Sequence, residues 1–188
     1  MSALESLRAV LPEGARDAKL NLSAVLDGGS LSVPQRLMVA VACAIASRSG
    51  ALRDALTEEA SLRGVEAAVL DDARAAASLL AMNNVYYRFR HMVGKPGYSQ
   101  RPPRLRMNRL AQPKTSRTEL ELACLAVSAI HGCEACVQAH ERVVLEGGLT
   151  EEQVHDAVRI AAVVHAVAVS LELDRETELA VAPTVRAA

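Results

Sequence analysis

Apolar residues recur at helical spacing along most of this 188-residue chain. After Thr150, one helix face is marked by Val154, Ala157, Val158, Ala161, Ala162, His165 and Ala168. Thr150 can cap that helix, and Gln153 can complete a capping box. Residues 37–46, 69–82 and 119–130 are also rich in Ala and Leu and contain no Gly or Pro, which predicts helices. No stretch alternates as a half-buried strand does. The pattern therefore predicts an all-α fold without a sheet.

Two parts of the chain resemble each other. VACAIASRSG, which ends at Gly50, is similar to LAVSAIHG, which ends at Gly132. In both cases a charged helix and then an Ala-rich helix are expected to follow, and Asp72 in the first copy corresponds loosely to Asp156 in the second. We predict a single domain over residues 1–188 that contains two approximate repeats, 35–82 and 117–172. The repeats should pack face to face, because one amphipathic hairpin cannot bury its apolar stripe alone.

The alignment at the two glycines sets a register between the copies. It places Ala51 and Asp54 where the second copy has Cys133 and Cys136. Thiol chemistry is therefore expected only in the second copy.

The segment between the copies, residues 83–113, carries helix breakers at Lys95-Pro96-Gly97 and Arg101-Pro102-Pro103. It also holds all four aromatic residues of the chain, Tyr86, Tyr87, Phe89 and Tyr98. We interpret it as a structural linker, with a docking rim as the alternative use of the same rings.

Composition narrows the class of protein. The apolar fraction of 51% indicates a folded globular chain, and the formal charge of −1 gives no electrostatic reason to expect a nucleic acid partner. The start, MSALESLRAVLP, lacks the uninterrupted apolar segment of a secretory signal. The apolar runs 37–47 and 160–171 are shorter than the roughly 18 residues of a membrane span. We expect a cytoplasmic protein with no membrane partner, in which four cysteines do not form a structural disulfide framework.

The stretch GCEACVQAHE, residues 132–141, contains the main candidate for chemistry. Gly132 should end one helix, so that Cys133 and Cys136 lie in the first turn of the next, on one face and close enough to form a disulfide. A helix N-terminus favours thiolates, because its backbone amides are unpaired. His140 follows four residues after Cys136 on that face, and its imidazole can exchange protons near neutral pH.

Glu121 lies inside the apolar segment ELELACLAVSAI, where a carboxylate needs a hydrogen-bond partner or a proton. Its helical stripe, shared with Leu125 and Ser128, can face the cysteine turn once the chain has reversed. His140 would satisfy Glu121, and the two would form a proton relay.

Two other readings of the cysteine pair stay open. Zinc commonly uses a C-x-x-C pair, and Cys133, Cys136, His140 and Glu121 could supply four ligands, although no second C-x-x-C or H-x₃-H pair exists. The pair could also be a chance feature of a structural helix. The remaining cysteines and histidines receive no chemical role, and the cysteines are expected to be buried and inert: Cys43, Cys124, His91, His131, His155 and His165.

The sequence resembles the alkyl hydroperoxide reductase D (AhpD) family of the carboxymuconolactone decarboxylase-like superfamily. The resemblance rests on LPEGARDAKLNL near the start, MNNVYYR at 82–88, LRMN at 105–108, and the motif E-L-x₁₀-C-x-x-C-x-x-x-H from Glu121 to His140. It implies an all-helical protein, commonly a homotrimer, that acts as a disulfide reductase and lipoyl-dependent peroxidase.

The resemblance also implies roles for individual residues. Cys136 would attack the peroxide or a partner's disulfide and pass through a sulfenic acid, Cys133 would donate a proton and resolve it to an internal disulfide, and Glu121 and His140 would relay protons. Some members carry His at the position of Ala135, so that auxiliary proton path is absent here. The helix-terminus argument alone would instead favour Cys133 as the more acidic thiol.

No bound cofactor or metal is expected from the resemblance. Dihydrolipoamide on a 2-oxoacid dehydrogenase subunit would restore the dithiol, with dihydrolipoamide dehydrogenase and NADH upstream, and the peroxiredoxin AhpC would accept electrons. Two alternatives from other classes are a carboxymuconolactone decarboxylase-type lyase and a non-catalytic Cys₂His metal-binding module.

Overall fold

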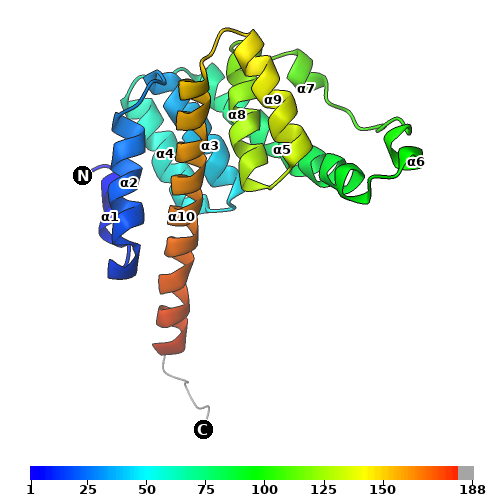
Figure 1. Ribbon diagram of the computed structural model, residues 1–188. Coiled ribbons are helices and arrows are strands. Elements are labelled where there is room, and N and C mark those ends of the chain that lie inside the picture. The colour runs from blue at the N-terminus through cyan, green and yellow to red at the C-terminus, as the bar shows by residue number, and fades with distance from the viewer. Residues whose placement is uncertain (182–188) are drawn as a thin grey trace.

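The computed structural model describes the backbone of residues 1–181 and the side chains of residues 1–173. All regular structure in this part is helical, as the sequence predicts (Figure 1). The elements are α1 (Ala3–Ala9), the 3-10 helix η1 (Glu13–Ala15), α2 (Arg16–Asp27), α3 (Val33–Ala46), α4 (Gly50–Leu62), α5 (Ala67–Val93), α6 (Pro96–Ser99), α7 (Asn108–Ala111), α8 (Arg117–Ile130), α9 (Glu134–Glu146) and α10 (Glu151–Val181).

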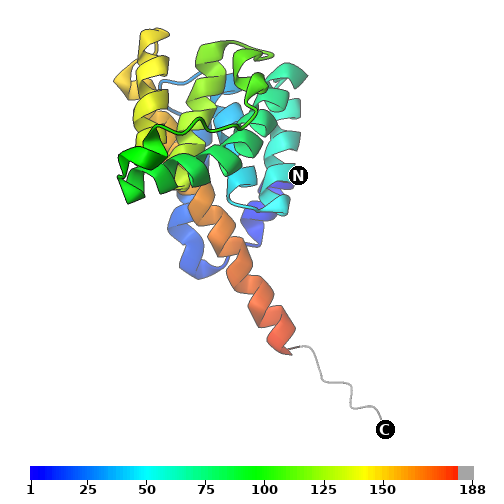
Figure 2. The ribbon, with the colours of Figure 1, turned by 90° about the vertical axis from the view of Figure 1, so that its right-hand side faces the viewer.

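Two helices form the centre of the bundle. Residues 36–44 of α3 and 120–128 of α8 are buried without interruption, so both helices are enclosed on all sides. α3 packs against α4, α5, α8 and α10, and α8 packs against α3, α5, α9 and α10 (Figure 2). A helix that is apolar all round belongs in a core. The abundance of Ala in both helices lets their neighbours approach closely.

The helix bounds reveal a constant offset between the two halves of the bundle. α8, α9 and α10 each begin 84 residues after α3, α4 and α5, that is, Arg117 after Val33, Glu134 after Gly50, and Glu151 after Ala67. α3 and α8 both have 14 residues, and α4 and α9 both have 13. The register expected from the two glycines was therefore wrong by two residues. Cys133 and Cys136 correspond to Ser49 and Leu52, not to Ala51 and Asp54.

The turns at the ends of α3 and α8 have the same backbone structure. Ser49 N donates to Ala44 O at 3.1 Å, and Cys133 N donates to Ser128 O at 3.1 Å. The residue before each donor has a positive φ, 59° at Arg48 and 64° at Gly132. The left-handed conformation suits Gly132, whereas Arg48 adopts it at a steric cost.

Two corresponding carboxylates fasten the chain at the start of α3 and before α8. Asp72 on α5 is fully buried and accepts hydrogen bonds from Lys114 N, Thr115 N and the Thr115 hydroxyl. Asp156 on α10 accepts from Ser30 N and its hydroxyl at 2.7 and 2.8 Å. Burial raises the pKa of each carboxyl group, but these hydrogen bonds and a nearby arginine outweigh burial and leave both pKa values below the usual one.

The interpretation of residues 83–113 as a linker was wrong for its first third. α5 continues through Val93 and ends at Gly94, which has a φ of 63°. No Gly or Pro interrupts this part, and Asn83 and Asn84 are buried against the bundle, so packing supports a helix there. Three of the aromatic residues, Tyr86, Tyr87 and Phe89, are therefore helical. The segment after Gly94 carries only the short helices α6 and α7.

α10 contains the one stretch within the described residues, Glu151–Leu173, that is long and apolar enough to cross a membrane, with a mean hydropathy of 1.5. The expectation that none would reach this length counted only uninterrupted apolar runs, and this stretch includes Asp156 and Arg159. α10 packs against α2, α3 and α8 along a buried stripe, which makes it a core helix. The stripe consists of Ala157, Ile160, Ala161, Val164, Val167 and Ala168.

Candidate active site

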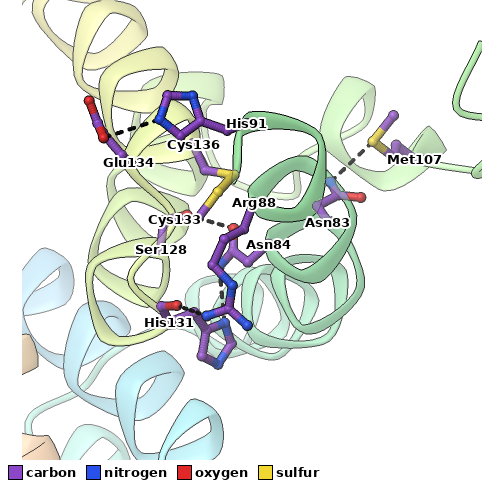
Figure 3. Close-up of a disulfide and its surroundings, with 10 residues drawn as sticks. All are labelled: Asn83, Asn84, Arg88, His91, Met107, Ser128, His131, Cys133, Glu134 and Cys136. Atoms are coloured by element: carbon purple, nitrogen blue, oxygen red, sulfur yellow. Dashed lines mark hydrogen bonds and ion pairs between the residues drawn. A yellow bond between two sulfur atoms is a disulfide. The ribbon is translucent and has the colours of Figure 1, made fainter. Parts of the chain in front are cut away.

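The two cysteines of the C-x-x-C motif lie at the turn between α8 and α9. Cys133 is the N-cap residue of α9 and Cys136 is in its first turn, as the sequence predicts. Their sulfur atoms form a disulfide, with the Cα atoms 5.3 Å apart (Figure 3). Cys133 is fully buried, whereas Cys136 is 6% exposed. Of the two sulfur-bearing residues, Cys136 is thus the one that reaches the surface.

A carboxylate and an imidazole meet between α8 and α9. Glu121 on α8 is 7% exposed, and its Oε2 lies 2.5 Å from Nδ1 of His140 on α9. The Nδ1–H group donates to the carboxylate, which leaves Nε2 of the neutral ring free to exchange a proton. Exposed Arg117 lies 3.9 Å from the other carboxylate oxygen, too far for a hydrogen bond. The predicted pairing of Glu121 with His140 is confirmed.

His140 follows Cys136 by one helical turn on α9. Residues four apart on a helix lie on the same face, with Cβ atoms about 6 Å from each other, so Cys136 and His140 share one face of α9. The structure therefore joins the four residues singled out in the sequence as two pairs, Cys133 with Cys136 and Glu121 with His140, both held by α8 and α9.

A polar network from α5 supports the other side of the turn. The buried hydroxyl of Ser128 donates to Asn84 Oδ1 at 3.1 Å, and Asn84 Nδ2 donates to His131 Nδ1 at 3.0 Å. Arg88 Nη1 donates to the carbonyl oxygen of His131 (Figure 3). Because Ser128 O accepts from Cys133 N, the network connects α5 directly to the cysteine turn.

Sequence reasoning missed the role of this network. Asn84 and Arg88 lie in MNNVYYR, which was used only as a mark of family resemblance, and His131 was given no chemistry. Adjacent asparagines in the middle of an Ala-rich helix were the available signal, because a buried amide requires partners.

An exposed contact between a histidine and a carboxylate lies on the solvent side of the turn. His91 Nε2, near the end of α5, is 3.3 Å from Glu134 Oε2 in the first turn of α9. From the sequence His91 received no chemical role, and the structure places it in contact with Glu134, the residue that follows Cys133 (Figure 3).

The other thiols are buried away from the disulfide. Cys43 and Cys124 are free and fully buried, as expected. Burial raises the pKa of both, and Glu121 and Asp72 raise that of Cys124 further. Neither thiol is available as a nucleophile near neutral pH. Among the described residues, no group of three or more His, Cys, Asp or Glu side chains is arranged to hold a metal ion.

Comparison with known proteins places this geometry in a family context. Residues 96–178 match the model of the carboxymuconolactone decarboxylase family. The chain is 63% identical over 172 residues to alkyl hydroperoxide reductase AhpD of Anaeromyxobacter sp. (strain Fw109-5), covering 92% of each chain. It is 61% identical over 173 residues to AhpD of Anaeromyxobacter dehalogenans (strain 2CP-C), covering 92% of each chain. It is also 47% identical over 169 residues to AhpD of Methylobacterium sp. (strain 4-46), covering 90% of this chain and 96% of that protein.

Proposed function

Because this chain belongs to the alkyl hydroperoxide reductase AhpD family, we propose that it reduces alkyl hydroperoxides with the dithiol formed by Cys133 and Cys136. The observation that carries this proposal is the Cys133–Cys136 disulfide at a helix N-terminus, beside the Glu121–His140 pair. A dithiol that closes and opens in this way is the working part of an oxidoreductase.

In the first step, the thiolate of Cys136 attacks the terminal oxygen of the hydroperoxide. The O–O bond breaks, the alkoxide takes a proton and leaves as the alcohol, and Cys136 becomes a sulfenic acid. The partial exposure of Cys136, against the complete burial of Cys133, supports Cys136 as the attacking residue.

In the second step, the sulfur of Cys133 attacks the sulfur of the sulfenic acid. Water leaves, and the disulfide forms, so that one dithiol and one hydroperoxide have become one disulfide, one alcohol and one water. Cys133 is close enough to complete this step without a change in the backbone, because the disulfide already spans the turn.

His140 relays the protons of both steps. Its Nε2 can take the thiol proton of Cys136 and return a proton to the leaving oxygen, while Glu121 fixes the tautomer and stabilises the imidazolium ion. The burial of Glu121 supports this role, since its one close side-chain partner among the described residues is His140.

The electrons come from dihydrolipoamide by thiol–disulfide exchange. Its dithiol reduces the Cys133–Cys136 disulfide and becomes lipoamide, so no bound cofactor is needed. Dihydrolipoamide on a 2-oxoacid dehydrogenase subunit, recharged by dihydrolipoamide dehydrogenase and NADH, is the proposed source, and the peroxiredoxin AhpC is a second electron acceptor. We place these reactions in the cytoplasm, where dithiols are kept reduced.

The protein acts as a homotrimer in this proposal. Three large apolar side chains are exposed along the end of α5 and at α6, which supports a contact surface there: Phe89, Met92 and Tyr98. Analytical ultracentrifugation of the full chain tests the subunit number.

The test of the function is NADH consumption with dihydrolipoamide dehydrogenase, lipoamide and cumene hydroperoxide. Cys136→Ser should abolish turnover, whereas Cys43→Ala, which removes a buried thiol elsewhere, should leave it near the wild-type rate. Oxidation should remove two titratable thiols from the wild type and none from Cys136→Ser. Full turnover by Cys136→Ser would end the proposal.

The family description also raises the possibility of a lyase of the carboxymuconolactone decarboxylase type. Such a lyase has no need of a dithiol. Turnover of a lactone substrate that survives alkylation of the reduced protein would favour it over the peroxidase.

A further inference from the structure

A cavity of about 640 Å³ lies between the α3–α4 turn, the middle of α5 and the end of α8. Its walls include four arginines, Arg48, Arg53, Arg74 and Arg88, together with His131. None of the residues that line it is acidic. This volume is within the range of small-molecule sites in proteins, which hold about 300–1,000 Å³.

The positive charge of the cavity is only partly neutralised. Arg53 is paired with Asp54 at 2.8 Å, and Arg88 donates to a backbone carbonyl, which removes no charge. The guanidinium groups of Arg48 and Arg74 make no hydrogen bond or ion pair with any described residue. Burial lowers the pKa of His131, backbone hydrogen bonds to Ala46 and Leu80 oppose this, and the charges of Arg88 and Arg48 lower it further.

The arginines of the cavity suit an acidic ligand, because arginine binds carboxylates through two parallel hydrogen bonds. The polar half of the cavity is thus built for a negatively charged group.

The other half of the cavity is apolar. Ile45, Ala46, Ala77, Ala81 and Val85 line it. An inorganic anion would fill only a small part of the volume and would leave this surface wet. The geometry points to an organic anion, an apolar chain that ends in a carboxylate, with the head group on Arg48 and Arg74 and the chain against α5.

The site is mechanically connected to the cysteine turn. Arg88 and Asn84 line the cavity and also hold His131 and Ser128, the residues on either side of the backbone that positions Cys133. A carboxylate-bearing ligand could come from two sources: a fatty-acid hydroperoxide as substrate, or an unreactive fatty acid. Binding itself does not depend on the proposed peroxidase activity.

Isothermal titration of the full chain with sodium decanoate tests the site. We expect saturable binding with one decanoate per chain, weakened about tenfold or more by Arg74→Gln and by Arg48→Gln, because each removes one charged hydrogen-bonding group. Arg16→Gln, which removes an exposed arginine on α2 that does not line the cavity, is the control and should bind as the wild type does. Decanol, which has the chain without the charge, should bind at least about tenfold more weakly than decanoate.

Lack of saturable decanoate binding would overturn the proposal, as would equal binding of decanol or an equal loss in Arg16→Gln. The NMR signals of the His131 imidazole should shift on decanoate binding in the wild type, and an unchanged spectrum would count against the location. Rates of peroxide reduction distinguish a fatty-acid hydroperoxide that binds as substrate from an unreactive fatty acid. If the natural ligand is the substrate, decanoate should inhibit the reduction of linoleic acid hydroperoxide competitively, but not the reduction of cumene hydroperoxide. If the natural ligand is a separate fatty acid, decanoate should leave both rates unaffected or change both alike.

Discussion

Replacing Glu121 by Gln tests whether the carboxylate assists catalysis or only fills space. Glu121 is 7% exposed, and its short contact is the 2.5 Å hydrogen bond to His140. The amide oxygen of Gln can still accept from Nδ1–H, so the free energy of unfolding should fall by only about 1 kcal/mol, the difference between a hydrogen bond to a charged group and one to a neutral group. The 3.9 Å pair with exposed Arg117 adds less than about 1 kcal/mol.

The effect on turnover should be much larger than the effect on stability. A neutral amide cannot stabilise the imidazolium ion, and proton transfer by a positioned side chain contributes about 10²–10⁴-fold, so we expect the rate of dithiol oxidation to fall about 100-fold. Glu121→Ala should lose as much activity, and in addition about 1–3 kcal/mol of stability, because it leaves a partly buried imidazole N–H unpaired.

The assay is stopped-flow oxidation of the reduced protein by excess cumene hydroperoxide, which isolates thiol chemistry from the electron supply. Glu119→Gln is the matched control. It makes the same change two residues earlier on α8, and Gln can replace Glu in the cap formed with Ser116. A Glu121→Gln protein that oxidises at the wild-type rate would refute the relay, whatever its stability.

Three further changes probe the frame around the site. Asp72→Asn should lower the free energy of unfolding by about 3 kcal/mol at pH 7, measured by urea unfolding, since it removes a buried charge from its hydrogen-bond donors. Because the pKa of Asp72 is lowered in the folded protein, the stability that its carboxylate contributes is present above about pH 4 and lost as the pH falls further. The difference in stability from the wild type should therefore shrink in acid, and a difference that stays constant would contradict this. Gly147→Ala should lower Tm, because its Cβ would lie 2.3 Å from the Thr118 hydroxyl oxygen; an unaltered Tm would show that Thr118 can move. Gly132→Ala should cost about 1 kcal/mol at its φ of 64° and slow the oxidation of the dithiol, whereas Gly14→Ala, with open space around it, should do neither.

Local signals in the sequence identified most of the helices and the residues of the cysteine turn. Thr150 and Gln153 do form the reciprocal capping bonds that their spacing predicts. Cys133 is the N-cap of α9 because Gly132 adopts the left-handed conformation that ends α8. These features depend on neighbours within one turn of helix, so a sequence pattern is sufficient to find them.

Features that depend on distant packing were less predictable. The extension of α5 to Val93 rests on Asn84 and its partners on α8, which lie more than 40 residues away in sequence. The repeat was aligned on Gly50 and Gly132 because glycine is conspicuous, yet the residue that matches Gly132 in backbone conformation is Arg48. A side chain held at positive φ by its surroundings leaves no mark in the sequence.

The corrected register explains how the turn can serve redox chemistry. The α3–α4 turn makes the same backbone hydrogen bonds as the α8–α9 turn, although Ser49 and Leu52 replace the two cysteines. The backbone of such a turn is therefore held by its own hydrogen bonds and by packing, without a covalent link. By the same reasoning the Cys133–Cys136 disulfide adds little to the fold, and its sulfurs can separate while their Cα atoms stay in place. A disulfide that the fold does not need is one that a reductant can open in every cycle.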